Sequence, residues 1–210
     1  MKSKVMIVED QTMPRELFEL RVQASERFEL ALSIDNAALA DVYCLRFPVD
    51  LILMDVITRD GENGLDAAAR IKRAFPQIKI IIVTSMPECS YLKRAKEIGV
   101  ESFWYKEEQR ESLLDVMERT MNGESVYPGA SPELTLGMAS SYQFTERELD
   151  ILREITSGDT NQEIADRLNM SVATVKTHIL NMLEKTGFRN RTELAVRARE
   201  SGLVILNRRN

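Results

Sequence analysis

Apolar and polar residues follow two alternating patterns along the first 121 residues of the chain. Short continuous apolar runs have the length of buried strands, and each is followed by a segment in which apolar residues recur at helical spacing. The runs predict strands at residues 4–8, 28–34, 51–54, 78–83 and 103–105. The helical spacing predicts helices from residue 12 onward and at 37–45, 65–75, 91–98 and 112–121. Five such units predict a parallel sheet with helices on both faces.

The alternation is lost between residues 122 and 143 and gives way to a purely helical pattern from Phe144 on. Turn dipeptides such as Asn122-Gly123 and Pro128-Gly129 interrupt the middle stretch, which indicates an interdomain linker with a short helix around residues 133–138. The predicted organisation is an α/β domain at 1–121, a linker at 122–143 and an all-α domain at 144–210.

Capping residues mark the helices of the second domain. A Thr or Asn followed three residues later by Glu forms a capping box. This pattern occurs at Thr145/Glu148, Thr160/Glu163 and Asn190/Glu193. Four helices are therefore expected, at 146–156, 161–168, 172–186 and 192–201. Because only the turn Asn169-Met170-Ser171 separates the second from the third, this pair is a candidate helix-turn-helix.

Charge is distributed unevenly along the chain. The whole chain has a net charge of −5, but residues 170–210 contain eight Lys and Arg against three Asp and Glu, which gives +5 and leaves −10 for the rest. A basic binding surface on an acidic body explains this asymmetry, and a solvated charged tail is the alternative.

Other bulk features indicate an ordinary cytoplasmic protein. With 44% hydrophobic and 29% charged residues, the composition is typical of globular domains. No apolar run approaches the roughly 18 residues of a membrane span, and the N-terminus lacks the architecture of a signal peptide. Cys44 and Cys89 fit neither a disulfide framework nor a zinc site, so we expect free, buried thiols.

Polar residues follow the ends of four predicted strands, and these ends meet at one edge of a parallel sheet. They are Glu9, Asp10, Asp55, Thr84 and Lys106. Three carboxylates repel one another unless a cation is bound, and hard oxygen ligands suit Mg²⁺. An aspartate beside such an ion can attack a phosphoryl donor, with Lys106 as a second cation and Thr84 as a hydroxyl donor. The structural alternatives are that Asp55 only begins a turn and that Lys106 is an ordinary surface lysine.

The residues around these positions resemble the receiver domain of bacterial response regulators. The resemblance covers about residues 1–121 and rests on Val8-Glu9-Asp10, Leu53-Met54-Asp55, Val83-Thr84-Ser85 and Phe103-Trp104-Tyr105-Lys106. It implies a flavodoxin-like fold and phosphotransfer from a partner histidine kinase to Asp55. It also implies that Mg²⁺ is held by Glu9, Asp10, Asp55 and the backbone carbonyl of Ile57. Thr84 and Lys106 would contact the phosphoryl group, and Phe103 would be the switch aromatic that rotates as Thr84 moves.

The chain departs from the family pattern in the loop after Asp55. Thr58-Arg59 stands where the family usually has Met-Pro, Asn63-Gly64 comes one residue late, and Ser102 takes a position where Gly is common. We therefore expect the loop conformation and the activation kinetics to differ from those of relatives. Ile57 and Met86 flank the expected phosphate, and we hypothesise that they hinder the hydrolytic water and lengthen the lifetime of the phosphoryl group.

The predicted helix at 172–186 has one apolar side and one polar side. Residues expected to pack inward are Val172, Val175, Ile179, Met182 and Leu183. Residues positioned to reach DNA phosphates are Lys176, Lys185, Arg189 and Arg191. Thr177 and Leu180 are expected to meet bases, and Asn181 to meet adenine or a phosphate. An ordinary surface helix is the alternative.

Four motifs in this part resemble the LuxR-type, or NarL/FixJ-class, DNA-binding domain of four helices. They are Phe144-Thr145-Glu146-Arg147-Glu148, Asn161-Gln162-Glu163-Ile164-Ala165, Thr174-Val175-Lys176-Thr177-His178 and Asn190-Arg191-Thr192-Glu193-Leu194. The resemblance spans nearly all of residues 144–203 and implies base reading by Lys176, Thr177 and Leu180. It also implies dimerisation through the last helix, with Leu194, Ala195 and Ala198 as candidates, so that a two-fold dimer would read paired half-sites.

Together these features predict a DNA-binding response regulator of a two-component system rather than an enzyme. A histidine kinase would phosphorylate Asp55, and phosphorylation would control dimerisation and transcription at promoter DNA. One alternative is a phosphorylation-independent regulator with a degenerate switch. Another is an aspartyl-phosphate phosphohydrolase, but many such enzymes carry an acid/base aspartate two residues after the nucleophile, where this chain has Ile57.

Overall fold

The computed structural model describes residues 2–85, 89–106 and 111–204, and within them the chain forms two compact units. The N-terminal unit comprises residues up to 85 together with 91–129, and the C-terminal unit comprises mainly the residues from 130 on. Met86, which we expected beside the phosphate, and the side chain of Cys89 lie outside the described part of the chain.

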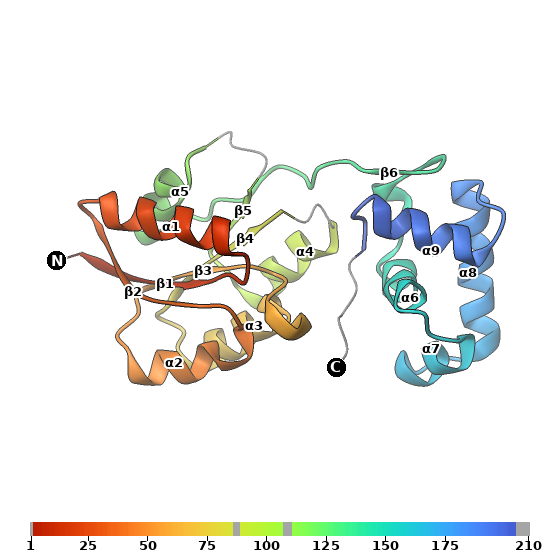
Figure 1. Ribbon diagram of the computed structural model, residues 1–210, viewed down its shortest axis with the longest axis horizontal. Coiled ribbons are helices and arrows are strands. Elements are labelled where there is room, and N and C mark those ends of the chain that lie inside the picture. Colours follow the sequence, from red (N-terminus) through yellow and green to blue (C-terminus); the bar gives the residue numbers. More distant parts are fainter. Residues whose placement is uncertain (1, 86–88, 107–110, 205–210) are drawn as a thin grey trace. The chain divides into compact units, whose positions relative to one another are not determined.

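The N-terminal unit is built on a five-stranded parallel sheet with the strand order β2-β1-β3-β4-β5 (Figure 1). The strands are β1 (Ser3–Val8), β2 (Phe28–Ile34), β3 (Leu51–Met54), β4 (Lys79–Thr84) and β5 (Ser102–Tyr105). The predicted parallel sheet is confirmed. The central strands are continuous apolar runs because helices cover both faces of the sheet and bury every residue of β3.

Helices enclose this sheet from two sides. They are α1 (Thr12–Ala24), α2 (Ala40–Arg46), α3 (Gly64–Ala74), α4 (Cys89–Ile98) and α5 (Leu113–Met121), with 3₁₀ turns η1 (Ala37–Leu39) and η2 (Arg59–Gly61). Phe18 of α1 and Met117 of α5 share a core with Val5, Leu53 and Val83 of the sheet. α2 and α3 lie on the opposite face (Figure 1). The second predicted helix begins as the 3₁₀ turn η1, whose first turn is capped by the Asn36 side chain.

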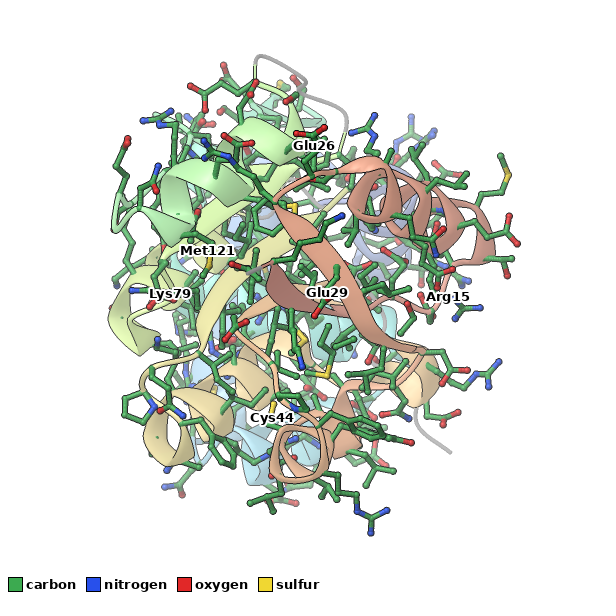
Figure 2. The ribbon with its side chains drawn as sticks, turned by 90° about the vertical axis from the view of Figure 1, so that its left-hand side faces the viewer. Arg15, Glu26, Glu29, Cys44, Lys79 and Met121 are labelled. Carbon is green, nitrogen blue, oxygen red and sulfur yellow. The ribbon has the colours of Figure 1, made fainter. Side chains whose placement is uncertain are left out.

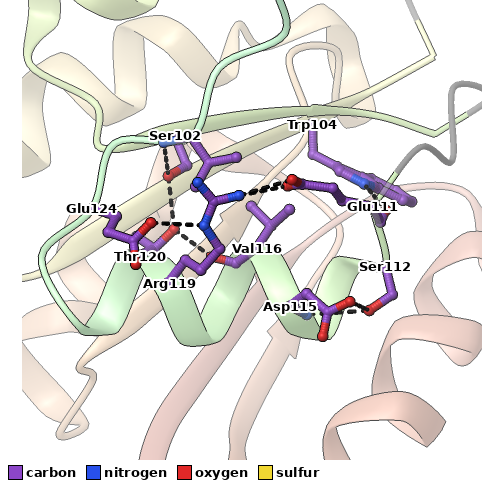
Figure 3. A network of polar contacts seen from close by, with 10 residues as sticks. Ser102, Trp104, Glu111, Ser112, Asp115, Val116, Arg119, Thr120 and Glu124 are labelled. Carbon is purple, nitrogen blue, oxygen red and sulfur yellow. Dashed lines mark hydrogen bonds and ion pairs between the residues drawn. The ribbon is translucent and has the colours of Figure 1, made fainter.

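Part of the predicted linker runs along the exposed edge of β5. The amide of Phe103 donates to the carbonyl of Val126 at 2.8 Å, and the amide of Val126 donates to Ser102 Oγ at 3.1 Å. Close to this contact, Arg119 of α5 pairs with Glu111 on one side of its guanidinium and Glu124 on the other (Figure 3). Ser102, which departs from the family's usual glycine, is therefore a buried anchor for the segment at residues 124–128.

Cys44 of α2, on the side of the N-terminal unit seen in Figure 2, is a free thiol as predicted, but it is half-buried rather than buried. Burial, reinforced by the nearby Asp41 carboxylate, raises the pKa of the Cys44 thiol to about 11. The thiol is therefore protonated and a poor nucleophile at neutral pH.

The C-terminal unit begins with a small hairpin instead of the short helix predicted at 133–138, so that prediction was wrong. Strands β6 (Thr135–Leu136) and β7 (Ala139–Ser140) pair in antiparallel fashion, and 3₁₀ turn η3 (Ser141–Gln143) follows. Gly137 forms the turn at φ +62°, and a Cβ there would lie 2.1 Å from the Thr186 carbonyl oxygen. A helix is excluded because the turn needs a left-handed glycine packed against backbone.

Four helices complete the C-terminal unit: α6 (Glu146–Thr156), α7 (Asn161–Arg167), α8 (Val172–Thr186) and α9 (Arg191–Glu200). The capping boxes at Thr145 and Thr160 are confirmed. At the third, Asn190 caps the amide of Glu193, but the Glu193 carboxylate accepts from the amide of Arg189, so the reciprocal half of the predicted box was wrong.

The turn between α7 and α8 confirms the predicted helix-turn-helix. Asn169 adopts φ +51°, and the amide of Met170 donates back to the carbonyl of Ala165 at 2.9 Å. Asparagine tolerates this left-handed conformation better than most residues. Ser171 then caps α8 by accepting from the amide of Thr174.

A close approach at Gly64 gives a test of the fold around Asp55. A Cβ at Gly64 would lie 1.8 Å from the Asp55 carbonyl oxygen, whereas one at Gly129 would meet nothing within 4 Å. We expect Gly64→Ala to lower the free energy of unfolding of the N-terminal unit by about 3 kcal/mol or more, as overpacking against backbone does. Gly129→Ala should change it by less than about 0.5 kcal/mol. Urea unfolding measures both, and equal values would contradict the packing described for Gly64.

Candidate functional site

Three carboxylates meet at the carboxyl ends of β1 and β3. Oxygen atoms of Glu9, Asp10 and Asp55 all lie within 4.8 Å of one another. Glu9 and Asp55 are buried, with 1% and 5% of their surfaces exposed, and Asp10 is half-buried. Parallel pairing of β1 with β3 aligns Val8 with Met54, which brings the residues that follow them together. The cluster predicted from strand ends is therefore present.

Lys106 lies between two of these carboxylates. Its Nζ is 2.5 Å from Glu9 Oε2 and 2.9 Å from Asp55 Oδ2. It follows β5, whose last residue Tyr105 is aligned with Thr84 of β4. The alternative that Lys106 is a surface lysine is wrong, because only 10% of its side chain is exposed. Lys106 supplies the positive charge that makes two buried carboxylates tolerable.

The electrostatics of Asp55 and Lys106 follow from this triad. Burial raises the pKa of Asp55 to about 7, Lys106 opposes that rise, and Glu9 adds to it. Burial on its own lowers the pKa of Lys106, but the charges of Asp55 and Glu9 outweigh it and raise the pKa above its ordinary value. In the absence of a second cation, Asp55 is therefore poised between its neutral and charged forms near neutral pH.

Backbone contacts hold the acidic residues in place. The amide of Asp55 donates to the Val8 carbonyl at 2.9 Å, and Asp55 Oδ1 accepts from the amide of Val56 at 2.7 Å. Glu9 is held by the amide of Gln11 on its carboxylate and by Arg15 on its carbonyl oxygen. Gln11 and Arg15 were missed from the sequence, because nothing in their spacing distinguishes them from ordinary residues at the start of α1.

Thr84 is the last residue of β4, and Phe103 is the second residue of the neighbouring strand β5, where it is aligned with Ile82; both are fully buried. The Phe103 ring packs 5.0 Å from the Tyr105 ring and 6.3 Å from the ring of Tyr127, which belongs to the segment along β5. The switch aromatic implied by the resemblance thus contacts a residue of the predicted linker. No sequence pattern indicated Tyr127 as its neighbour.

The donor set fits Mg²⁺. The cluster offers only carboxylate oxygens, it is partly open at Asp10, and two of its members already require a cationic partner. Hard divalent cations prefer such oxygen ligands and retain several waters. Glu9, Asp10 and Asp55 are the side chains that would hold the ion, and it would supply positive charge to a phosphoryl group at Asp55.

A second candidate surface is the outer side of α8 in the C-terminal unit. Thr174, Lys176, Thr177, Leu180 and Asn181 are all exposed. The opposite side is in the core, where Val175 and Met182 are fully buried and Ile179 is 8% exposed. Leu180 is 55% exposed, which leaves its side chain open to contact with an apolar group such as a thymine methyl.

Two cations predicted to reach DNA are held by contacts within the unit. Lys185 Nζ lies 2.7 and 2.8 Å from the two oxygens of Glu148 and also donates to the carbonyl of Gln143. Burial alone raises the pKa of Glu148, but hydrogen bonds from Lys185 and Thr145 outweigh it and hold the pKa below its ordinary value. Arg191 donates to the carbonyl of Asp159 and to the side chain of Asn161. Both cations thus also connect helices.

The residues proposed for dimerisation on α9 need correction. Leu194 and Ala198 are fully buried in the core of their own unit, and Ala195 packs against that core. Leu194 and Ala198 are therefore not available to a second copy, and their selection was wrong, whereas Ala195 is half-buried and its part in dimerisation stays a prediction. The apolar side chain that α9 does present is Val196, which is 49% exposed.

No helix within the described ranges is long and apolar enough to cross a membrane.

Comparison with known proteins matches both units. The family model of the response regulator receiver domain matches residues 5–118, and the model of the luxR family of bacterial regulatory proteins matches residues 142–198. The chain is 33% identical to the response regulator protein VraR of Staphylococcus epidermidis, over 97% of this chain and all of that protein. VraR of Staphylococcus aureus is 32% identical over the same share of each chain.

Solved structures share the fold at lower identity. RcsB from Salmonella enterica serovar Typhimurium, bound to promoter rprA in the presence of the phosphomimetic BeF₃⁻, has a TM-score of 0.59 at 17% identity and covers 94% of this chain and 98% of that chain. The response regulator ChrA of a heme-sensing two-component system has a TM-score of 0.53 at 21% identity, with 97% and 99% covered.

The raised pKa of Asp55 predicts an unusual pH dependence of stability. Because the pKa is about 7 in the folded chain against an ordinary value of 3.8, the folded state binds more protons between these values. Stability should therefore fall as pH rises from about 4 to about 7. In EDTA, Asp55→Asn should be more stable than the wild type at pH 8 by on the order of 2 kcal/mol, and should lose this advantage below pH 4.

Thermal unfolding across this pH range measures the effect. Glu26→Gln removes the same charge at an exposed position of the N-terminal unit (Figure 2) and serves as the control. An Asp55→Asn advantage that is the same at pH 4 and pH 8 would show that charge burial at Asp55 is not its cause.

Proposed function

Because the chain belongs to the LuxR-type response regulators, which join a receiver domain to a LuxR-family DNA-binding domain, we propose that phosphorylation of Asp55 by a histidine kinase controls its binding to promoter DNA. The observation that carries the proposal is the buried triad of Glu9, Asp55 and Lys106 at the carboxyl edge of the sheet. The proposal includes a histidine kinase as the phosphoryl donor, promoter DNA as the ligand of the C-terminal unit, and the cytoplasm as the location.

In the phosphotransfer step, a carboxylate oxygen of Asp55 forms a bond to phosphorus while the bond from phosphorus to the donor's nitrogen or oxygen breaks. The leaving group keeps the electron pair of the broken bond. Asp55 must be ionised to attack, but a pKa of about 7 leaves part of it protonated at neutral pH. A cation bound beside it before transfer would lower that pKa and increase the ionised fraction. Bound Mg²⁺, held by Glu9, Asp10, Asp55 and the Ile57 carbonyl, would supply that charge.

Lys106 and Thr84 would stabilise the product. Lys106 has three donor protons and already contacts Asp55 Oδ2, so it is placed to donate to a phosphoryl oxygen when one is attached. Thr84, at the end of β4, would donate its hydroxyl to another phosphoryl oxygen. The phosphohydrolase alternative has little support, since the position two residues after Asp55 is the half-buried Ile57, which cannot exchange protons.

The rest of the proposal concerns the output. A receiver that changes state can bias an equilibrium in the DNA-binding unit between free and bound, or monomeric and dimeric, forms. The packing of Phe103 against Tyr127 supports a route from the sheet into the linker. The structures of RcsB as dimers on DNA support a homodimer on paired half-sites, since the chain shares that fold.

Mass spectrometry tests the phosphoacceptor. The wild type incubated with acetyl phosphate and Mg²⁺ should gain one phosphoryl group, and omission of Mg²⁺ should slow the gain at least tenfold. Asp55→Ala should gain none, whereas Asp50→Ala, which removes an acid from the amino end of the same strand, should gain it normally. A wild type that remains unmodified would exclude phosphorylation at this site, and phosphorylation with unchanged DNA affinity and oligomeric state would exclude the switch.

DNA binding tests the outer side of α8. Lys176→Ala should weaken binding to specific and random DNA about equally and reduce the salt slope by about 1, because it removes a phosphate contact. Thr177→Ala should weaken only specific binding. Arg73→Ala removes an exposed positive charge from α3 and should leave binding unchanged. Fluorescence anisotropy at several salt concentrations measures each. If Arg73→Ala and Lys176→Ala behave alike, α8 is not the binding surface.

A further inference from the structure

The loop after Asp55 is closed by a buried hydroxyl. Thr58 is 2% exposed, although it lies in a polar loop at the surface of the unit. Its Oγ1 accepts from the amide of Ala37 at 3.0 Å and donates to the carbonyl of Glu62 at 3.0 Å. The amide of Thr58 donates to the same carbonyl at 3.1 Å. One side chain therefore closes its own loop and connects it to the segment that follows β2.

The loop accommodates one more residue than the family pattern. Turn η2 (Arg59–Gly61) contains Asp60 at φ +63°, a conformation that aspartate tolerates, and Ile57 pairs with Asn63 across its base. The amide of Gly64 donates to the Val56 carbonyl at 2.8 Å. These contacts hold both ends of the loop, and the left-handed Asp60 lies at its turn.

Other contacts of the loop are weaker than the one at Thr58. Arg59 pairs with Asp35 at 2.6 Å, but 62% of the Arg59 side chain is exposed, and such pairs contribute little. Asn36 Nδ2 lies 3.3 Å from an Asp60 oxygen at the surface. The Ala37 amide, by contrast, belongs to a fully buried residue and donates to the Thr58 hydroxyl, so removal of that hydroxyl takes away this acceptor. A buried donor without a partner is costly, so this contact determines the loop position.

We propose that Thr58 is a positioning residue for the metal site: its amide orients the peptide group between Ile57 and Thr58 through the Glu62 carbonyl, and its hydroxyl ties that peptide group to Ala37 and so fixes the position of the Ile57 carbonyl. The inference rests on the proposed function, in which that carbonyl is a ligand of Mg²⁺. It extends that function by giving the site a side chain that binds neither the ion nor the phosphoryl group.

The chemistry of threonine allows the role to be separated from simple packing. Thr58→Val keeps the shape and removes both hydrogen bonds of Oγ1, whereas Thr58→Ser keeps the hydroxyl and removes only a methyl group. Thr120→Val is the matched control. Thr120 is also fully buried in the N-terminal unit, and its hydroxyl bonds to Ser102 and to the Val116 carbonyl, but it lies in α5. Thr120→Val should therefore lower the stability of the protein without changing its affinity for Mg²⁺.

The experiment is a Mg²⁺ titration of the metal-free full-length protein by isothermal calorimetry. Thr58→Val should raise the Mg²⁺ dissociation constant about five- to tenfold, while Thr58→Ser and Thr120→Val should remain within about twofold of the wild type. Thermal melts in EDTA accompany each titration. If Thr58→Val does not fold, Thr58→Ala removes the same hydroxyl without risk of a clash and takes its place.

Two outcomes would overturn the inference alone: wild-type Mg²⁺ affinity in Thr58→Val, or a loss in Thr58→Ser as large as that in Thr58→Val. An equal loss in Thr120→Val would assign the effect to general destabilisation and overturn it as well. A wild type that binds no Mg²⁺ at millimolar concentrations would instead overturn the metal site of the proposed function, together with any role of Thr58 toward it.

Discussion

Two carboxylates buried within reach of one lysine are the constraint on which the N-terminal unit depends. Glu9 and Asp55 are placed at neighbouring strand ends by the parallel pairing of β1 with β3, and Lys106 reaches both from the end of β5. Such an arrangement is costly to bury, since every ion must be taken out of water. The sheet therefore carries an unfavourable local charge distribution that binding of a further cation would relieve.

This cost also explains why the site is surrounded by backbone contacts. The amides of Gln11 and Val56 donate to the carboxylates, and the loop from Asp55 to Gly64 is tied at its base and through Thr58. Ligands that repel one another remain close only if the chain that bears them cannot move apart. In the proposed function, the same rigidity would prepare the oxygens for an ion and reduce the reorganisation needed when one binds.

Much of the fold follows from local patterns in the sequence. The predicted limits of β2, β3, α6 and α8 are those observed, because each element is bounded by capping or turn residues and has a clear periodicity. The hairpin at Thr135–Ser140 was missed because strands of two residues are too short to show a period. Its turn depends on contact between Gly137 and the carbonyl of Thr186, which is distant in sequence.

The site was predictable to a similar degree. The alternation of apolar runs and helical segments located the strand ends, and Glu9, Asp10, Asp55 and Lys106 follow those ends. Parallel strands bring such residues together at one edge of the sheet. The hydrogen bonds of Thr58 were not predictable, because its partner Ala37 lies 21 residues earlier and no motif connects them. For α9, periodicity identified Leu194 and Ala198 as apolar but cannot tell a side chain in its own core from one at an interface.

The segment at residues 124–128 has a further consequence for where the first domain ends. β5 is the outermost strand of the sheet, and an open strand edge can pair with another chain and promote aggregation. Val126 occupies that edge through Phe103 and Ser102, and Tyr127 donates to the carbonyl of Val100. A fragment cut at residue 121 would uncover it. The smallest self-contained form of the N-terminal unit thus extends to Gly129, with the segment at residues 124–128 covering the outer edge of β5.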